Sequence, residues 1–141
     1  MDYSPGLRGV IAGETAISTV GKEGTSLRYR GYDATELTSN NTYEEVASLI
    51  LTDSIEDKNF KKSFSKYYLE TTKDTKLNEL LDEIKEKLHP MDVVRTIVSY
   101  KGELTTLRKK SLDNEDKTEL SARITAIVCY IIASYLSLIH I

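Results

Sequence analysis

Residues 74–88, DTKLNELLDEIKEKL, contain the pattern that decides the fold class of this chain. Asp74 comes first, and an aspartate at this place can accept hydrogen bonds from the first free backbone N–H groups of a helix. Apolar side chains follow at positions i, i+3, i+4, i+7 and i+11, which puts them along one helical face. They are Leu77, Leu80, Leu81, Ile84 and Leu88. The stretch therefore predicts an amphipathic helix that packs against other elements.

Two further helices are predicted on the N-terminal side of this stretch. Residues 42–45, Thr-Tyr-Glu-Glu, form a capping box, in which the threonine hydroxyl and the glutamate satisfy free backbone donors. The helix that they open carries Val46, Leu49 and Ile50 on one face. Ser54 is the expected cap of the next helix, whose aromatic residues recur at helical spacing: Phe60, Phe64, Tyr67 and Tyr68.

Another helix is predicted directly after the amphipathic stretch. His89-Pro90 ends that stretch and opens the new helix, because proline suits the first helical turn. Met91, Val94 and Val98 form its expected buried side, and Gly102 is expected to end it.

The last predicted helix begins at about Glu119, after a charged connection at residues 108–117. The 18 residues from Ile124 to Ile141 have no formal charge, which is the lower limit of what can span a bilayer. No basic residue follows them, so we expect a buried core helix and no membrane partner, with a membrane-spanning helix as the alternative. Its apolar residues are Leu120, Ile124, Ile127, Val128 and Ile131.

The N-terminal part carries the one strand-like pattern. Thr15–Val20 is rich in β-branched residues, Gly21–Gly24 supplies turn residues, and Ser26–Arg30 alternates between apolar and polar side chains. Asp33 can then cap one short turn of helix. The predicted fold class is therefore mainly α, with a short N-terminal β-hairpin followed by about six helices.

Composition limits the partners and the compartment. The 141 residues suffice for one domain, and a net charge of −3 gives no electrostatic reason to bind nucleic acid. The single cysteine, Cys129, excludes an internal disulfide framework and fits a reducing compartment; its apolar surroundings predict a buried packing role. Residues 1–5 show no secretory signal, so a cytoplasmic location is expected.

The residues themselves predict neither a catalytic nor a metal site. The two histidines, His89 and His140, lie at a helix junction and at the second-last position, and the HExxH and CxxC spacings of zinc sites are absent. Arg28 and Arg30 point together from the polar face of the hairpin and could bind a phosphate or carboxylate, although a salt-bridged surface is the other interpretation.

Three ordered blocks carry a family resemblance. Residues 5–10 and 12–22, followed by Leu27–Asp33, resemble the N-terminal segment of the citrate synthase family. The residues at 12–13 and 19–22 look most like its 2-methylcitrate synthase branch. Tyr43–Ala47 is similar to the family's next helix. His89–Thr96, HPMDVVRT, is similar to a further family segment.

The resemblance implies a helical large domain that forms a homodimer and a smaller domain that closes over coenzyme A. Residues 1–141 would be the N-terminal portion of that large domain, with the small domain absent. The implied enzyme is an acyltransferase that condenses propionyl-CoA or acetyl-CoA with oxaloacetate, converting the acyl group to an alkyl group. The coenzyme A thioester is a substrate, and no cofactor is tightly bound. Arg8 matches a family arginine near the coenzyme A phosphates.

The resemblance also implies that this chain alone is inactive. In the family an aspartate takes the α-carbon proton and histidines stabilise the enol and polarise oxaloacetate, in later segments that include a His-Gly-Gly-Ala-Asn-Glu block. The 141 residues contain no such block. The alternative is a non-catalytic module that pairs with a complete subunit or with a complementary chain.

Overall fold

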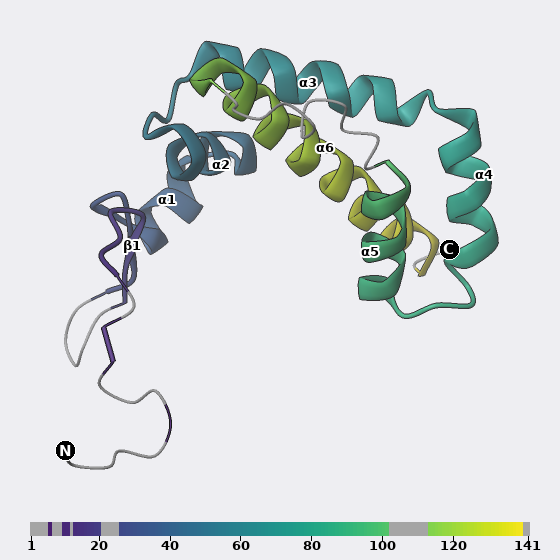
Figure 1. Cartoon of the computed structure of the whole chain (residues 1–141), viewed down its shortest axis with the longest axis horizontal. Coiled ribbons are helices and arrows are strands. Elements are labelled where there is room, and N and C mark those ends of the chain that lie inside the picture. The colour runs from purple at the N-terminus through teal and green to yellow at the C-terminus, as the bar shows by residue number, and fades with distance from the viewer. Residues whose placement is uncertain (1–5, 7–9, 12, 21–25, 102–112, 140–141) are drawn as a thin grey trace. The chain divides into compact units, whose positions relative to one another are not determined.

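The computed structural model describes residues 6, 10–11, 13–20, 26–101 and 113–139 (Figure 1). For residues 138 and 139 it describes the backbone alone. The chain divides into two compact units, Met1–Asn41 and Thr42–Ile141. Within the described residues there are six helices and one small antiparallel sheet, which confirms the mainly helical fold class.

The first unit contains the sheet and one short helix. Strands β1 (Ser18–Thr19), β2 (Arg28–Tyr29) and β3 (Tyr32–Asp33) lie in the order β1-β2-β3. Tyr29 pairs with Ser18 on one side and with Tyr32 on the other. The predicted pairing of two strands is confirmed, whereas β3 was not predicted; the expected turn at 21–24 lies outside the described residues.

The turn between β2 and β3 explains why the third strand can form. Arg30 and Gly31 both have positive φ, 49° and 88°, as a two-residue hairpin turn of the favoured hand requires. Arg28 Nη1 donates to the Gly31 carbonyl at 3.3 Å. Helix α1 (Ala34–Asn40) follows at once, capped by Asp33, which accepts from the Thr35 backbone N–H at 2.8 Å. The predicted cap is thus confirmed.

The second unit is a helical assembly of five described helices. They are α2 (Tyr43–Thr52), α3 (Lys58–Thr72), α4 (Thr75–Ile84), α5 (Pro90–Tyr100) and α6 (Asn114–Ile139). Helix α3 packs along the N-terminal half of α6, and α5 packs against its C-terminal half (Figure 1).

Local capping sets where most of these helices begin. The Thr42 capping box is confirmed: the Glu45 N–H donates to Thr42 Oγ1 at 3.3 Å, and the Thr42 N–H donates to Glu45 Oε2 at 3.0 Å. Asp74 caps α4 and His89 caps α5, as predicted.

The predicted cap of α3 is wrong. Asp57 caps this helix by accepting from the Phe60 N–H at 2.8 Å, whereas the Ser54 carbonyl accepts from Ser48 Oγ at 2.6 Å. Asp53 ends α2 with a left-handed φ of 64°, and residues 54–56 separate it from the Asp57 cap of α3.

The buried core forms two clusters along α6. One joins α4, α5 and α6, and the other joins α2, α3 and α6. Their buried members are Leu77, Leu81, Val93, Ile97, Ile127 and Ile131 in the first, and Ala47, Phe60, Phe64, Ala122 and Ala126 in the second. The two alanines of α6 let its backbone approach the phenylalanines of α3 closely. Apolar burial of this kind supplies most of the driving force for folding.

The buried face of α5 and the first residue of α6 differ from the prediction. On α5 the fully buried residues are Val93 and Ile97, while Met91 is 65% exposed. Val94 and Val98 are only partly buried, because the helix is rotated so that the 93/97 stripe faces α6. Helix α6 begins at Asn114, earlier than predicted, because Asp113 accepts from the Asp116 N–H at 2.7 Å and starts it.

Candidate functional site

The sequence-predicted site residues do not form a common site. Arg8, the candidate for coenzyme A binding, lies outside the described residues, and so does His140. His89 Nδ1 accepts from the Met91 N–H at 3.3 Å, which gives this exposed histidine a capping role. Arg28 stabilises the turn between β2 and β3.

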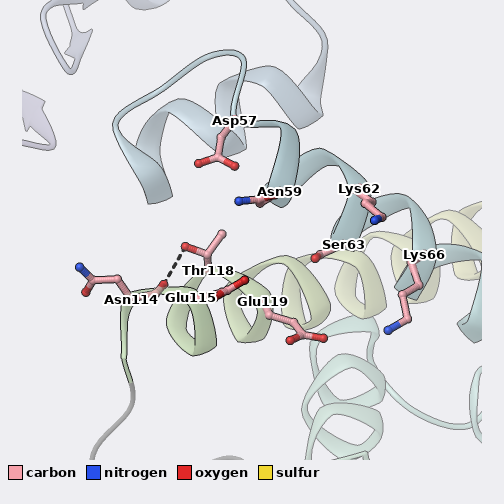
Figure 2. A pocket seen from close by; sticks show the side chains of 9 residues that line it. All are labelled: Asp57, Asn59, Lys62, Ser63, Lys66, Asn114, Glu115, Thr118 and Glu119. Carbon is pink, nitrogen blue, oxygen red and sulfur yellow. Dashed lines mark hydrogen bonds between the residues drawn. The ribbon is translucent and has the colours of Figure 1, made fainter.

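A polar cleft opens between the first turns of α3 and α6. Its volume is about 530 Å³, and Figure 2 shows lysines from α3 on one wall and glutamates from α6 on the other. Two lysines therefore face three carboxylates, and this nearly balanced mixture has no strong excess of either charge that would select a phosphate or a metal ion. The lining residues are Asp57, Asn59, Lys62, Ser63, Lys66, Asn114, Glu115, Thr118 and Glu119.

Several of these polar groups already serve local structure. Asp57 caps α3, and Thr118 Oγ1 donates to the Asn114 carbonyl at 2.9 Å, the contact drawn in Figure 2. Among the described residues, no group of three or more His, Cys, Asp or Glu side chains is placed to hold a metal ion. The cleft has the features of a solvated surface between two helix ends.

Tyr67 is the centre of a polar cluster that joins α3 to α6. Its hydroxyl donates to the Glu119 carboxylate. The Arg123 guanidinium lies 5.4 Å and the Lys66 ammonium 4.7 Å from its ring centre. Burial, followed by the bond to Glu119, raises the pKa of Tyr67 to about 12. The hydroxyl thus remains protonated, and it acts as a hydrogen-bond donor between the two helices.

A second set of polar contacts fixes α4. Asp74 accepts from the Leu77 N–H at 3.0 Å and also pairs with the Lys101 ammonium at the end of α5. The hydrogen bond from Lys101, followed by that from Leu77, lowers the pKa of Asp74. One turn further along α4, the Tyr130 hydroxyl of α6 donates to Asn78 Oδ1 at 2.7 Å. The Asp74–Lys101 and Asn78–Tyr130 contacts join residues that are distant in sequence, and they hold α4 against α5 and α6.

Substitutions of Asp74 can separate its two roles. Asp74→Ala removes the cap and the ion pair, so we expect a loss of about 1–2 kcal/mol in the free energy of unfolding. Asp74→Asn keeps a good cap and should cost less than about 1 kcal/mol. Because the folded-state pKa is lowered, the ionic contribution is present above the unfolded pKa and is lost as pH falls through the folded value.

Urea unfolding at neutral and acidic pH measures this difference. The gap in stability between the wild type and Asp74→Asn should shrink as pH falls below about 4, where the carboxylate becomes protonated. A gap of constant size across this range would contradict the assigned role of the Lys101 pair.

An apolar groove lies on the other side of α3 and was missed by the sequence analysis. Its volume is about 690 Å³. Tyr43 and Leu69 on its rim are 62% and 57% exposed. We define the apolar groove by its lining residues, Thr42, Tyr43, Glu44, Phe64, Ser65, Tyr68, Leu69, Cys129 and Ala133. The exposed apolar positions of α3 and α6 were signals of it, but only packing shows which apolar residues remain uncovered.

Cys129 lies in this groove and packs against the cluster of α2, α3 and α6, as a packing role predicts, but it is only half-buried and not buried. Burial, the largest cause, raises the pKa of the Cys129 thiol, and burial followed by the interaction with Cys129 raises the pKa of Tyr43 to about 12. A raised pKa makes the thiol a weak nucleophile at neutral pH.

Helix α6 is also the one described helix that is long and apolar enough to cross a membrane by length and composition. Only 22% of its most apolar window is buried by the rest of the described chain. Ile132 and Leu136 are 44% and 50% exposed. The apolar surface of α6 therefore extends beyond the partners that the described helices provide.

Comparisons with known proteins agree with the residue blocks quoted above. The family model described as "Citrate synthase, C-terminal domain" matches residues 6–138. The 2-methylcitrate synthase of Shewanella oneidensis is 41% identical over 127 residues, covering 89% of this chain and 34% of the relative. The citrate synthase of Mycolicibacterium smegmatis is 36% identical over 97 residues, which covers 69% of this chain and 26% of that protein.

A third relative combines both names. The citrate/2-methylcitrate synthase of Bacillus subtilis is 35% identical over 98 residues, covering 69% of this chain and 26% of the relative. The chain thus spans about a third or less of the length of the curated relatives that it matches. Since the family model covers nearly all of the 141 residues, this chain belongs to the citrate synthase family, a family of transferases.

Proposed function

We propose that this chain is the N-terminal portion of the large domain of a 2-methylcitrate or citrate synthase. The complete enzyme is an acyltransferase of the cytoplasm that condenses propionyl-CoA or acetyl-CoA with oxaloacetate and acts as a homodimer. The chain contributes a rigid helical scaffold, and catalytic groups come from the remainder. The observation that carries the proposal is the 41% identity to a 2-methylcitrate synthase across 89% of the chain.

The exposed surface of α6 supports the scaffold role. A helix that is apolar on most sides is buried in a large core or in a membrane. Ile127 and Ile131 already lie in the core between α4 and α5, which suits a helix of a globular domain. Ile132 and Leu136 remain exposed and would be covered by the remainder of the synthase.

Co-expression tests this proposal. The chain is produced with the part of the Shewanella oneidensis relative that lies outside the aligned 127 residues. We expect the two polypeptides to co-purify and to release coenzyme A from propionyl-CoA or acetyl-CoA in the presence of oxaloacetate. Ile131→Glu, which places a charge at a fully buried position, is the control that should abolish both results. Retention of the chain in carbonate-washed membranes, with or without the second polypeptide, would contradict the proposal.

Arg8 has a separate expected effect in the co-purified enzyme. If its guanidinium contacts the coenzyme A phosphates, Arg8→Gln removes a charge-assisted hydrogen bond and should raise the KM for the acyl-CoA about tenfold. Arg28→Gln is the matched control, because Arg28 already donates to the Gly31 carbonyl, and it should leave KM unchanged. An unchanged KM in the Arg8 variant would remove Arg8 from the binding site.

The second candidate function is a non-catalytic module that pairs with a complete subunit. The apolar groove and the exposed residues of α6 favour it, because both offer an uncovered apolar surface. In this case the chain should co-purify with a complete synthase subunit without adding activity. The co-expression assay separates the two functions, since only the first restores catalysis with the partial chain.

A further inference from the structure

The apolar groove is built from three helices. Tyr43 and its neighbours come from the start of α2, Phe64 to Leu69 from the middle of α3, and Cys129 and Ala133 from α6. Aromatic stacking organises its floor: the Phe64 and Tyr68 rings lie 6.2 Å apart, and Tyr68 meets the Tyr130 ring edge-on at 6.0 Å. The floor is therefore set by packing inside the chain, and a partner would meet a preformed surface.

The groove continues as an apolar surface along α6. Cys129, Ala133 and Leu136 are spaced by four and three residues, which places them on one helical face. Ile132 lies beside this face, and it and Leu136 are among the exposed large apolar residues. The continuous surface therefore extends from the capping box of α2 toward the C-terminal turns of α6.

The chemistry of the lining indicates an apolar occupant. Glu44 is the one charged residue among the nine that line the groove, and the remaining polar groups are hydroxyls and the thiol. A phosphate or carboxylate ligand would find no cation here, whereas apolar side chains would bury the rims of Tyr43 and Leu69.

We propose that the apolar groove receives an amphipathic helical segment from the remaining two-thirds of the synthase polypeptide. This inference rests on the proposed function and names the surface through which the chain binds its remainder. The relatives are about three times as long as the part that this chain covers, so they contain ample polypeptide to fill a groove of about 690 Å³. Its three-helix walls suit a helix that inserts apolar anchors.

Alkylation of Cys129 reports whether the groove is filled. Cys129 is the single cysteine of the chain, so its modification by iodoacetamide can be followed at one peptide by mass spectrometry. We expect the rate to fall at least severalfold when the chain is co-purified with the remainder of the Shewanella oneidensis relative. An unrelated helical protein at the same concentration should not change the rate.

A pair of exposed leucines supplies matched variants. Leu69→Glu places a charge on the rim of the groove, and we expect it to weaken association with the remainder roughly tenfold or more, because it removes buried apolar area. Leu51→Glu makes the same change at a 46% exposed position on α2 that does not line the groove, and it should bind as the wild type does. Circular dichroism shows whether both variants keep their helices.

The outcomes separate this inference from the proposed function. Two results would show that the groove is not the docking surface, while leaving the proposed function intact. One is restored synthase activity with an unchanged rate of Cys129 alkylation, and the other is equal binding by the two leucine variants. Absence of association and of activity would overturn both. Protection of Cys129 by phosphatidylcholine vesicles, without protection by the remainder, would assign the groove to a membrane surface and also reject the proposal.

Discussion

On its own, the 141-residue chain should release no coenzyme A from propionyl-CoA or acetyl-CoA with oxaloacetate above the rate without enzyme. The family's condensation needs a base for the α-carbon proton and donors that stabilise the enol, all held in one site. This sequence has two histidines and no His-Gly-Gly-Ala-Asn-Glu block. His89 is committed to capping α5, and its ring nitrogen accepts from Met91.

The expected loss is therefore complete, and not a partial reduction. Removing members of a catalytic group leaves only the catalysis that binding and preorganised donors provide. A coenzyme A release assay at high chain concentration measures this directly, and the co-expressed pair from the complementation experiment is the positive control. Release above background by the purified chain alone would contradict this prediction.

Replacing Phe60 by alanine should lower the free energy of unfolding by about 3–5 kcal/mol, the usual range for a buried phenylalanine. Its side chain is fully buried, its ring lies 6.3 Å from that of Phe64, and it packs in the cluster that joins α3 to Ala122 and Ala126 of α6. The truncation leaves a cavity at the contact between these two helices, which cannot close without moving their backbones.

Leu51→Ala is the matched control for this substitution. Leu51 is 46% exposed, so its truncation removes little buried area and should cost less than about 1 kcal/mol. Urea unfolding followed by circular dichroism, at a chain concentration low enough to limit association, measures both variants. Equal losses for the two variants would show that the α3–α6 cluster is not the stabilising core of this unit.

The sequence alone determined the features that depend on neighbours within one helical turn. Four helix starts were predicted, because a cap and the N–H group that it accepts from are two or three residues apart. They are the Thr42–Glu45 capping box, Asp33, Asp74 and His89-Pro90. The amphipathic stripe of residues 77–84 is a local property as well. The ordered blocks within residues 5–96 identified the family from sequence alone, since they can be compared with other proteins without knowledge of the fold.

Tertiary structure decided what depends on residues far apart in the chain. Tyr67 meets Glu119 and Asn78 meets Tyr130 across 52 positions, and no local pattern marks such pairs. The rotation of α5 that buries Val93 and Ile97 and exposes Met91 follows from its packing against α6. The apolar groove has the same origin: periodicity shows which residues are apolar, but only the packed helices show which of them remain uncovered, because burial depends on the arrangement of whole elements.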